Sequence, residues 1–386
     1  MSMTFDVIVI GGGVVGLAAA VGMKHRGYSV AVLDKNTMQV NLDKKDPRVY
    51  AVNQASQHLL EQLDIWNAIA HNRVSPYRNM HVWDANNGAS IDFDARMVSA
   101  NKLGHIVEES VIKSTLLNKA EEMGIDFFPG QALTGIETVD DHIKAKTDKG
   151  LIDARLMIVA DGGTSKTRDM LGVSLTSWPY HHHALVTTVE VEKPHLLTAY
   201  QVFNEDGPLA FLPLVDANQC SIVWSTRPKK AEWLCSLPED AFNEALTHAF
   251  AAKLGACRVI EQRFQFPLIM RHVNQYCGNR WIVMGDAAHT IHPLAGLGLN
   301  VGLEDVAAWL NILDISKVKN RIISSRQLNT YQRNRKTSVW KIIALMQGIK
   351  GFFSTPVPPL AYIRGLGIKT CNRLPMLKRF FIGHAG

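Results

Sequence analysis

The stretch Phe5-Asp6-Val7-Ile8-Val9-Ile10-Gly11-Gly12-Gly13-Val14-Val15-Gly16 decides the fold of this chain. Its apolar run Phe5–Ile10 predicts a short buried strand, and Val14–Arg26 predicts a helix with small residues on one face. Ser29–Asp34 predicts a second strand. A strand, a helix and a strand in this order form a right-handed parallel βαβ unit.

The glycines between this strand and helix match the spacing G-x-G-x-x-G. In that pattern Gly11 makes a tight turn, Gly13 lets the backbone approach a pyrophosphate, and Gly16 lets the helix pack on the strand. Asp34 ends the second strand 18 residues after Gly16 (34 − 16), where a carboxylate that binds a ribose is expected. The pattern predicts a dinucleotide site and leaves NAD and FAD both open.

The bulk composition sets limits on the class of protein. The 386 residues are 47% hydrophobic and 20% charged, which fits a globular protein of two domains or one domain with an insertion. The net charge of +6 is scattered, and no Lys/Arg-rich run predicts nucleic-acid binding. Five cysteines without a C-x-x-C pair predict neither a disulfide framework nor a zinc site, so we expect a reducing cytoplasm, with a peripheral place at the inner membrane as an alternative. The apolar segment Val7–Met23 follows Asp6 and holds the glycine turn, so it predicts neither a signal peptide nor a membrane span.

Two later strands also end in turns of glycine and aspartate. Leu156–Ala160 runs into Asp161-Gly162-Gly163, and Arg280–Met284 runs into Gly285-Asp286. Strands that end in this way are typical of an open sheet whose ligand lies at the carboxyl ends.

Three features favour FAD over NAD. Asp286 suits the hydroxylated ribityl chain and the pyrophosphate of a flavin, and the Asp161 turn runs on to Arg168 at a helix start. Arg48 follows the second strand within Asp46–Asn53. Each has an ordinary alternative, because Asp161 suits any turn, Arg168 suits a surface ion pair and Arg48 suits a solvated loop. Their order along one chain favours the flavin.

The middle of the chain predicts a second sheet. Ala184–Val191, Ala199–Phe203, Leu209–Leu214 and Cys220–Ser225 are expected to be successive antiparallel strands, followed by a helix near Glu239–Lys253. The predicted class is α/β, a Rossmann-like FAD-binding domain with an inserted antiparallel-sheet substrate domain and C-terminal helices. We assign 1–72, 102–175 and 271–330 to the FAD-binding domain, 73–101 and 176–270 to the substrate domain, and 331–386 to the helical region.

These features together resemble the class A flavin monooxygenases, and within them the ubiquinone-biosynthesis hydroxylases of polyprenylated phenols. The closer resemblance lies in segments spread over nearly the whole chain, leaning toward the 2-polyprenylphenol hydroxylases. These segments are Asp46–Val52, Pro76-Tyr77-Arg78, Val82-Trp83-Asp84, Leu103–Ile112, Gly207–Leu214, Phe266-Pro267-Leu268 and Gly285–Thr290. Two positions depart from the family pattern: Asp34 stands where Glu is commoner, and Leu297 stands where the loop usually carries Gln.

The resemblance implies a reaction and its residues. NAD(P)H, bound transiently, reduces FAD, O2 adds at flavin C4a, and the hydroperoxide attacks an electron-rich phenol ring. The residues expected to hold FAD are Gly11, Gly13, Gly16, Asp34, Arg48, Asp161, Asp286, Gly298 and Asn300. Pro293 is expected beside the reacting oxygen, and the backbone around Gly296, Gly298 and Leu299 to face the charge of the reduced flavin. Phe211, Leu212 and Pro213 are expected in the substrate wall, with core packing as an equal alternative.

Several histidines and the C-terminal stretch leave alternatives open. His181-His182-His183 predicts a solvent-facing turn and not a metal site, because consecutive strand residues face opposite ways. His289 and His292 suit either loop orientation or proton transfer. Trp340–Phe353 suits a membrane surface, the core or a partner subunit, and contact with a biosynthetic complex or a second copy stays open. Hydroxylation of a small soluble phenol and a non-catalytic flavin-fold scaffold are the alternative functions.

Overall fold

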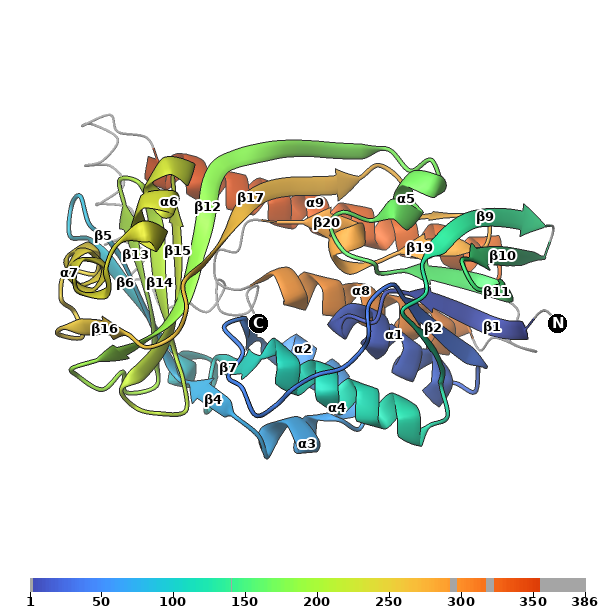
Figure 1. Cartoon of the computed structure of the whole chain (residues 1–386), viewed down its shortest axis with the longest axis horizontal. Helices are drawn as coiled ribbons and strands as arrows, with labels where there is room; N and C mark the ends of the chain where they lie inside the picture. The colour runs from blue at the N-terminus through green and yellow to red at the C-terminus, as the bar shows by residue number, and fades with distance from the viewer. Residues whose placement is uncertain (1–2, 140, 292–296, 317–322, 355–386) are drawn as a thin grey trace.

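The computed structural model describes residues 3–139, 141–291, 297–316 and 323–354. In this part of the chain the strands form three sheets, and helices cover them (Figure 1). The helices are α1 (Val14–His25), α2 (Gln54–Gln62), α3 (Trp66–Ala70), α4 (Glu109–Glu122), α5 (Lys166–Met170), α6 (Pro228–Ser236), α7 (Glu239–Ala249), α8 (Leu297–Ser316) and α9 (Ser325–Ser354).

The first sheet carries the predicted βαβ unit. Its strands are β1 (Met3–Ile10), β2 (Val30–Asp34), β8 (Asp126–Pro129), β9 (Leu133–Val139), β10 (His142–Thr147), β11 (Leu151–Val159), β18 (Cys277–Gly278) and β19 (Trp281–Val283). The order β18-β19-β11-β1-β2-β8 contains a parallel centre of β19, β11, β1, β2 and β8. Helix α1 packs between α4 and α8. The predicted strands and helix of the opening unit are confirmed, with ends shifted by one or two residues.

Burial explains why the opening segment forms a central strand. Val7, Ile8 and Val9 are completely buried, and every residue of α1 from Leu17 to Met23 is buried as well. A parallel strand covered on both faces requires such an unbroken apolar run. Each fully buried Val or Ile side chain contributes ~1.5–3 kcal/mol relative to an exposed one.

The second sheet has strands from distant parts of the chain. They are β5 (Asn79–Asp84), β6 (Ser90–Asp94), β12 (Leu175–Val191), β13 (Thr198–Asn204), β14 (Gly207–Pro213), β15 (Gln219–Thr226), β16 (Cys257–Val259), β17 (Phe264–Val273) and β20 (His289–Thr290). The order is β20-β17-β12-β15-β14-β13-β5-β6, with β16 on β12. The expected antiparallel pairing holds from β12 to β15, but β13 pairs with β5 in parallel, which corrects the fully antiparallel expectation.

Strands β12 and β17 differ most from the sequence expectation. The pattern located only Ala184–Val191 of the 17-residue β12 and did not locate β17. Both contain a proline, Pro179 and Pro267, and β12 has a register shift between Pro179 and His182. Proline within a run argues against a strand unless a bulge or an edge accommodates it. The expected turn at the three histidines is therefore wrong, because they lie within β12 beside this bulge.

A third, smaller sheet lies between the other two. Its strands β3 (Val49–Val52), β7 (Gly104–Glu108) and β4 (Val74–Tyr77) are antiparallel. Ala51, Tyr77 and Ile106 of this sheet pack against Ala199 and Leu212 of the second sheet. The third sheet thus joins the two larger ones.

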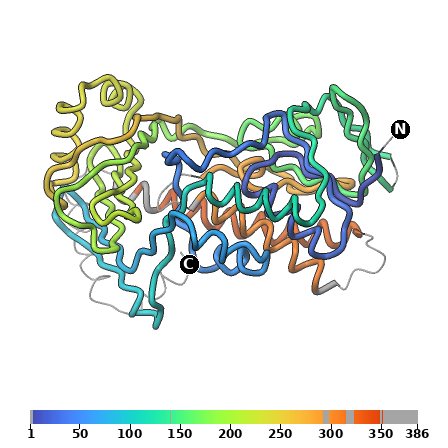
Figure 2. The backbone as a smooth tube through the Cα atoms, turned by 60° about the horizontal axis from the view of Figure 1, so that its bottom comes forward, coloured from blue at the N-terminus to red at the C-terminus, as the bar shows by residue number. Residues whose placement is uncertain are grey.

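Helix α9 runs from the first sheet to the second, as the red end of the tube shows in Figure 2. Its start contacts β18, and further along Met346 packs on Phe203 of β13. Trp340 and Leu345 stay exposed, although the Trp340 ring contacts His272. Among the described residues no helix is long and apolar enough to cross a membrane. The predicted domain boundaries stay a prediction.

Candidate active site

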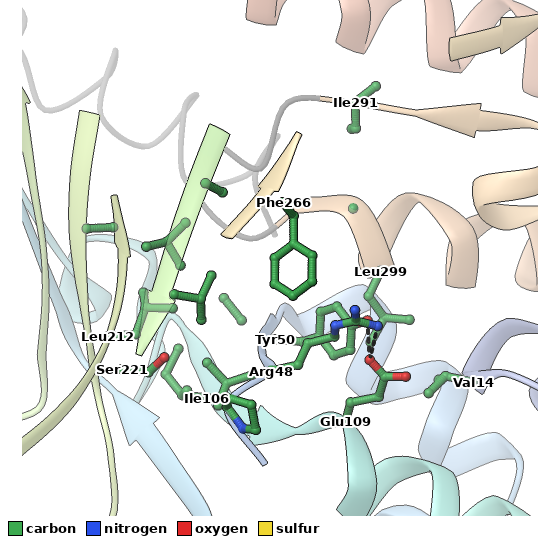
Figure 3. A pocket seen from close by; sticks show the side chains of 18 of the residues that line it. Val14, Arg48, Tyr50, Ile106, Glu109, Leu212, Ser221, Phe266, Ile291 and Leu299 are labelled. Atoms are coloured by element: carbon green, nitrogen blue, oxygen red, sulfur yellow. Dashed lines mark hydrogen bonds and ion pairs between the residues drawn. The ribbon is translucent and has the colours of Figure 1, made fainter. Parts of the chain in front are cut away.

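A cavity of about 870 Å³ lies where the three sheets meet. At one end it is lined by turns that follow the strands of the first sheet, including Gly13, Gly162 and Asp286. At the other end it is lined by the inner face of the second sheet (Figure 3). This volume is near the upper end of the usual range for ligand sites, so one cavity has room for a large cofactor and a substrate.

The glycine turn leaves no room for side chains at two positions. A Cβ at Gly11, whose φ is +110°, would lie 2.3 Å from the Ala160 carbonyl oxygen. A Cβ at Gly16 would lie 2.0 Å from the Gly11 carbonyl oxygen, which would force helix α1 off the turn. At Gly13 no atom lies within 4 Å of such a Cβ, and this residue lines the cavity. The turn therefore has the shape predicted for a backbone that approaches a diphosphate.

Asp34 holds the glycine turn through its carboxylate. The Gly12 N–H donates to Asp34 Oδ2 at 2.6 Å, and the Asn36 N–H donates to Oδ1 at 2.7 Å. The shorter Asp at this position thus reaches the turn directly. Its contact with a ribose stays a prediction.

The Asp161 turn offers a free acceptor. Thr167 Oγ1 donates to Asp161 Oδ2 at 2.8 Å, whereas the buried Asp161 Oδ1 has no hydrogen-bond partner in the described part of the chain. Arg168 is only 4% exposed and donates to the carbonyls of Gly163 and Ala287, at 3.3 and 3.2 Å. Arg168 therefore ties this turn to the Gly285 turn, and its Nε also lies 3.5 Å from the exposed carboxylate of Asp169, so the ion-pair alternative holds beside this role.

The Gly285-Asp286 turn is fixed by a buried ion cluster. The carboxylate of Asp305 in α8 is completely buried and accepts from the Gly285 N–H at 2.8 Å and from Arg335 Nε of α9 at 2.6 Å. His289 Nε2 lies 2.7 Å from the same carboxylate. Burial favours protonation of Asp305, but His289 and Arg335 outweigh it and hold the pKa of this carboxyl below its ordinary value. The pairing of His289 with Asp305 favours its orienting role over proton transfer.

Asp286 itself projects into the cavity. Its side chain is accessible from the cavity, although protein surrounds the cavity on most sides. This burial raises the pKa of the Asp286 carboxyl, while the charges of His289 and Arg48 act to lower it. An acidic side chain at this place can accept hydrogen bonds from hydroxyl groups, as predicted for the ribityl chain.

Arg48 lies in the cavity beside Glu109 and Tyr50, which the sequence did not single out as site residues. Arg48 Nη1 donates to Glu109 Oε2 at 2.9 Å, and the Tyr50 hydroxyl donates to the same oxygen at 2.9 Å (Figure 3). The Arg48 guanidinium also lies 5.8 Å from the centre of the Phe266 ring. Burial, followed by the charge of Glu109, raises the pKa of Tyr50 well above its ordinary value, so Tyr50 stays a hydroxyl donor.

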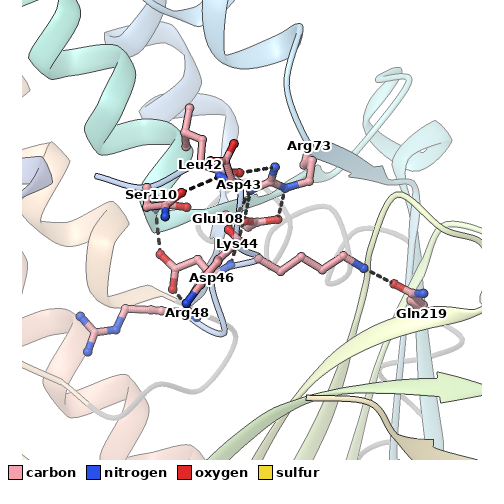
Figure 4. A network of polar contacts seen from close by, with 11 residues as sticks. Leu42, Asp43, Lys44, Asp46, Arg48, Arg73, Glu108, Ser110 and Gln219 are labelled. Carbon is pink, nitrogen blue, oxygen red and sulfur yellow. Dashed lines mark hydrogen bonds and ion pairs between the residues drawn. The ribbon is translucent and has the colours of Figure 1, made fainter. Parts of the chain in front are cut away.

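A network of polar contacts holds the loop that carries Arg48 (Figure 4). Asp46 Oδ1 accepts from the Arg48 N–H at 2.9 Å, and its Oδ2 accepts from the Ser110 N–H at 3.0 Å. Glu108 Oε2 accepts from the Asp46 N–H at 3.0 Å, and Arg73 makes two hydrogen bonds of 2.7 Å with the Glu108 carboxylate. The loop of Arg48 is thus fixed, although the Arg48 side chain is 56% exposed, and its contact with the cofactor stays a prediction.

The start of helix α8 borders the cavity. Gly298 and Leu299 line it, and the N–H groups of a helix start favour negative charge. Pro293 and Gly296 lie outside the described residues, and so does the side chain of Leu297. Asn300 donates to the Ala51 carbonyl at 2.8 Å and accepts from the Asn53 N–H at 3.1 Å, so its amide anchors α8 to the third sheet, and its cofactor contact stays a prediction.

The substrate wall follows the alternation of the strands. The second sheet lines the cavity with small and medium-sized side chains on β12 to β15 and with larger ones on neighbouring strands. The first group is Ala184, Val186, Ala199, Ala210, Leu212, Ser221, Val223 and Ser225, and the second includes Met80, Phe264, Phe266 and Leu268. Phe211 faces the other way, where its ring stacks on Phe250 at 3.7 Å between centres. Leu212 therefore lines the cavity, whereas Phe211 follows the core-packing alternative and Pro213 shares its strand face, and a substrate contact of these residues stays a prediction.

The residues of the first-sheet end fit FAD. The glycine turn, in which a side chain at Gly11 or Gly16 would clash with the backbone, suits a diphosphate, and the accessible Asp286 carboxylate suits hydroxyl donors. The sequence profile of the family described as FAD binding domain matches residues 4–345. The chain therefore belongs to this family, its fold is that of the class A flavin monooxygenases, and FAD is its cofactor. In the described residues no group of three or more His, Cys, Asp or Glu side chains could hold a metal ion.

Relatives of known name extend over the whole chain. The 3-demethoxyubiquinol 3-hydroxylase of Escherichia coli (strain K12) is 32% identical over 385 residues, covering 98% of each chain. The ubiquinone hydroxylase UbiL of Rhodospirillum rubrum is 29% identical, covering 98% of this chain and 89% of its own. Among solved structures, p-nitrophenol 4-monooxygenase PnpA from Pseudomonas putida DLL-E4 is similar with a TM-score of 0.81 and 17% identity, over 99% of this chain and 97% of its own.

Proposed function

We propose that this protein is an FAD-dependent hydroxylase that uses NAD(P)H and O2 to hydroxylate the ring of a polyprenylated phenol in ubiquinone biosynthesis. The observation that carries the proposal is the single cavity in which a cofactor cradle faces an apolar wall of the second sheet. The names of the relatives, ubiquinone hydroxylases and a demethoxyubiquinol hydroxylase, support the phenolic substrate class.

Bound FAD supplies the redox chemistry that lets NAD(P)H and O2 convert the ring. The chain holds it through the glycine turn, Asp161, Asp286 and the loop of Arg48. The helix start at Gly298 and Leu299, which lines the cavity, would offer N–H groups to negative charge on a bound flavin. The apolar wall would keep water from the reacting atoms.

The size and lining of the cavity favour a bulky apolar substrate over a small soluble phenol. Small side chains such as Ala184 and Ala210 leave space on the wall, and Val186 and Val223 keep it apolar. A narrow polar site would have favoured the small phenol. The exposed Trp340 and Leu345 of α9 keep docking to a membrane or a partner as a proposal.

The test uses the purified holoprotein. We expect a yellow protein whose oxidation of NADH or NADPH is stimulated by a prenylated phenol, with a product that carries one additional oxygen atom on the ring. Stimulated oxidation that yields only hydrogen peroxide, with every prenylated phenol returned unchanged, would contradict the proposal. Tight FAD binding without reduction by either nucleotide would favour a scaffold. Quinone-intermediate profiling of a strain that lacks the protein identifies the ring position.

A further inference from the structure

The cavity is bordered by two buried side-chain hydroxyls that have no partner in the described structure. Thr290 Oγ1 lies at the cofactor end, 3.3 Å from where a Cβ on Gly163 would stand. Ser221 Oγ lies at the other end, in the wall formed by the second sheet. Each end of the cavity therefore holds one hydroxyl whose hydrogen-bonding capacity the protein itself does not use.

Ser221 has one apolar and one polar neighbour across the sheet. In the sheet it stands opposite Leu212 of β14 on one side and Thr188 of β12 on the other. Along its own strand the next cavity-facing residue is Val223 (Figure 3 shows Ser221 beside Leu212). A serine that only filled space here would be better replaced by alanine, because an unpaired buried hydroxyl loses its hydrogen bonds to water.

Thr226 serves as a comparison for Ser221, because the two hydroxyls are equally buried and differ in which face of the sheet they occupy. It lies on the same strand, is completely buried like Ser221, and its Oγ1 is also unpartnered. Thr226 faces away from the cavity, however, because it is an odd number of residues from Ser221 and side chains alternate across a strand. Ser221 therefore lines the cavity, and Thr226 does not.

We propose that the Ser221 hydroxyl binds the phenolic oxygen of the aromatic substrate and so orients its ring in the cavity. A serine hydroxyl both donates and accepts, so it can pair with a phenol as well as with a phenolate. The inference rests on the proposed function, from which it takes the phenolic class of the substrate. Ser221 acts as a specificity-determining residue that touches the substrate and takes no part in the oxygen transfer.

The test compares two ligands and three variants in the holoenzyme. The ligands are 2-geranylphenol and the same molecule without its hydroxyl group, and their binding is measured by the change in flavin absorbance. The wild type is expected to bind the phenol about five-fold more tightly than the deoxy compound, the effect of one hydrogen bond. Ser221→Ala is expected to abolish this preference, and the matched control Thr226→Val to retain it. Ser221→Cys, which keeps the shape with a weaker hydrogen-bonding group, covers the case in which the alanine variant fails to fold.

The outcomes separate the inference from the proposed function. Retention of the wild-type preference in Ser221→Ala and Ser221→Cys overturns the inference, and so does a wild type that binds both ligands equally. Either result leaves ring hydroxylation by the wild type as independent support for the proposed function. A preference that depends on Ser221 in a protein that hydroxylates no prenylated phenol supports the binding site and overturns the proposed function.

Discussion

Replacing Asp305 by asparagine removes the charge at the centre of the buried cluster behind the Gly285 turn. The completely buried carboxylate receives hydrogen bonds from Gly285 and Arg335 and pairs with His289. The neutral amide leaves the Arg335 guanidinium, which is 5% exposed, with Glu304 at 3.2 Å as its remaining charged partner.

The expected loss follows from the cost of an unpaired buried charge. Removing one partner of a buried ion pair destabilises a protein by about 3–5 kcal/mol. Because Glu304 stays close and an amide oxygen still accepts, we expect the lower end, about 3 kcal/mol. The Gly285 N–H also loses its charged acceptor, so the turn that carries Asp286 loosens and FAD is expected to bind about ten-fold more weakly, which corresponds to ~1.4 kcal/mol.

Urea unfolding measures the first effect and a titration of the apoprotein with FAD measures the second. Asp314→Asn is the matched control, because it lies on the same helix and pairs with Arg26 on the surface, where its side chain is 51% exposed. An exposed pair contributes about 0–1 kcal/mol, and this control is expected to bind FAD normally. If Asp305→Asn loses no more stability than Asp314→Asn, the reasoning about the cluster is refuted.

Three further predictions concern other parts of the molecule. Burial lowers the pKa of His272 from 6.5 to about 4, so the folded protein keeps it neutral, and stability falls by up to ~1.4 kcal/mol per pH unit as the pH drops from 6.5 to 4. His272→Phe, which removes two unpartnered ring nitrogens, is expected to flatten this dependence in unfolding experiments, and an unchanged slope would contradict the assignment. Gly16→Ala is expected to purify without FAD because its Cβ would meet the Gly11 carbonyl oxygen at 2.0 Å, whereas Gly348→Ala, with no atom within 4 Å, should stay yellow. Ala210→Phe, on the inner face of β14, is expected to raise the KM for a prenylated phenol at least ten-fold with FAD content unchanged, and an unaltered KM would place the substrate elsewhere.

The sequence predicts the parts of the site that are local. The glycine turn, Asp34 and the Asp161 and Gly285 turns each lie within a few residues of a strand end, where residue type and backbone geometry are tightly coupled. The partners of these residues are distant: Glu109 is 61 residues from Arg48, and Arg335 is 30 residues from Asp305. The spacing of residues along the chain does not predict such pairings, because the partners come together only when the helices dock on the sheet.

The substrate wall shows a second limit. One face of the second sheet packs on α6 and α7, and the other face lines the cavity. Its strands therefore carry apolar residues on both sides. Because side chains alternate along a strand, Phe211 and Leu212 must lie on opposite faces of the sheet. Since neither face is polar, the sequence does not predict which of the two residues lines the cavity. Strand β17 was missed for the related reason that Pro267 and Arg271 interrupt its apolar run.

The long strands β12 and β17 decide how the cavity can open. They stay paired from Leu175 with Val273 to Val186 with Phe264, and the bulge at His182 bends them without parting them. Helix α9 braces the same two halves along another side. A hinge needs a few residues that can absorb large changes in φ and ψ, and paired strands resist such changes. We therefore expect the cofactor half and the substrate half to move as one rigid frame, with ligands entering and leaving through rearrangements of loops at its rim.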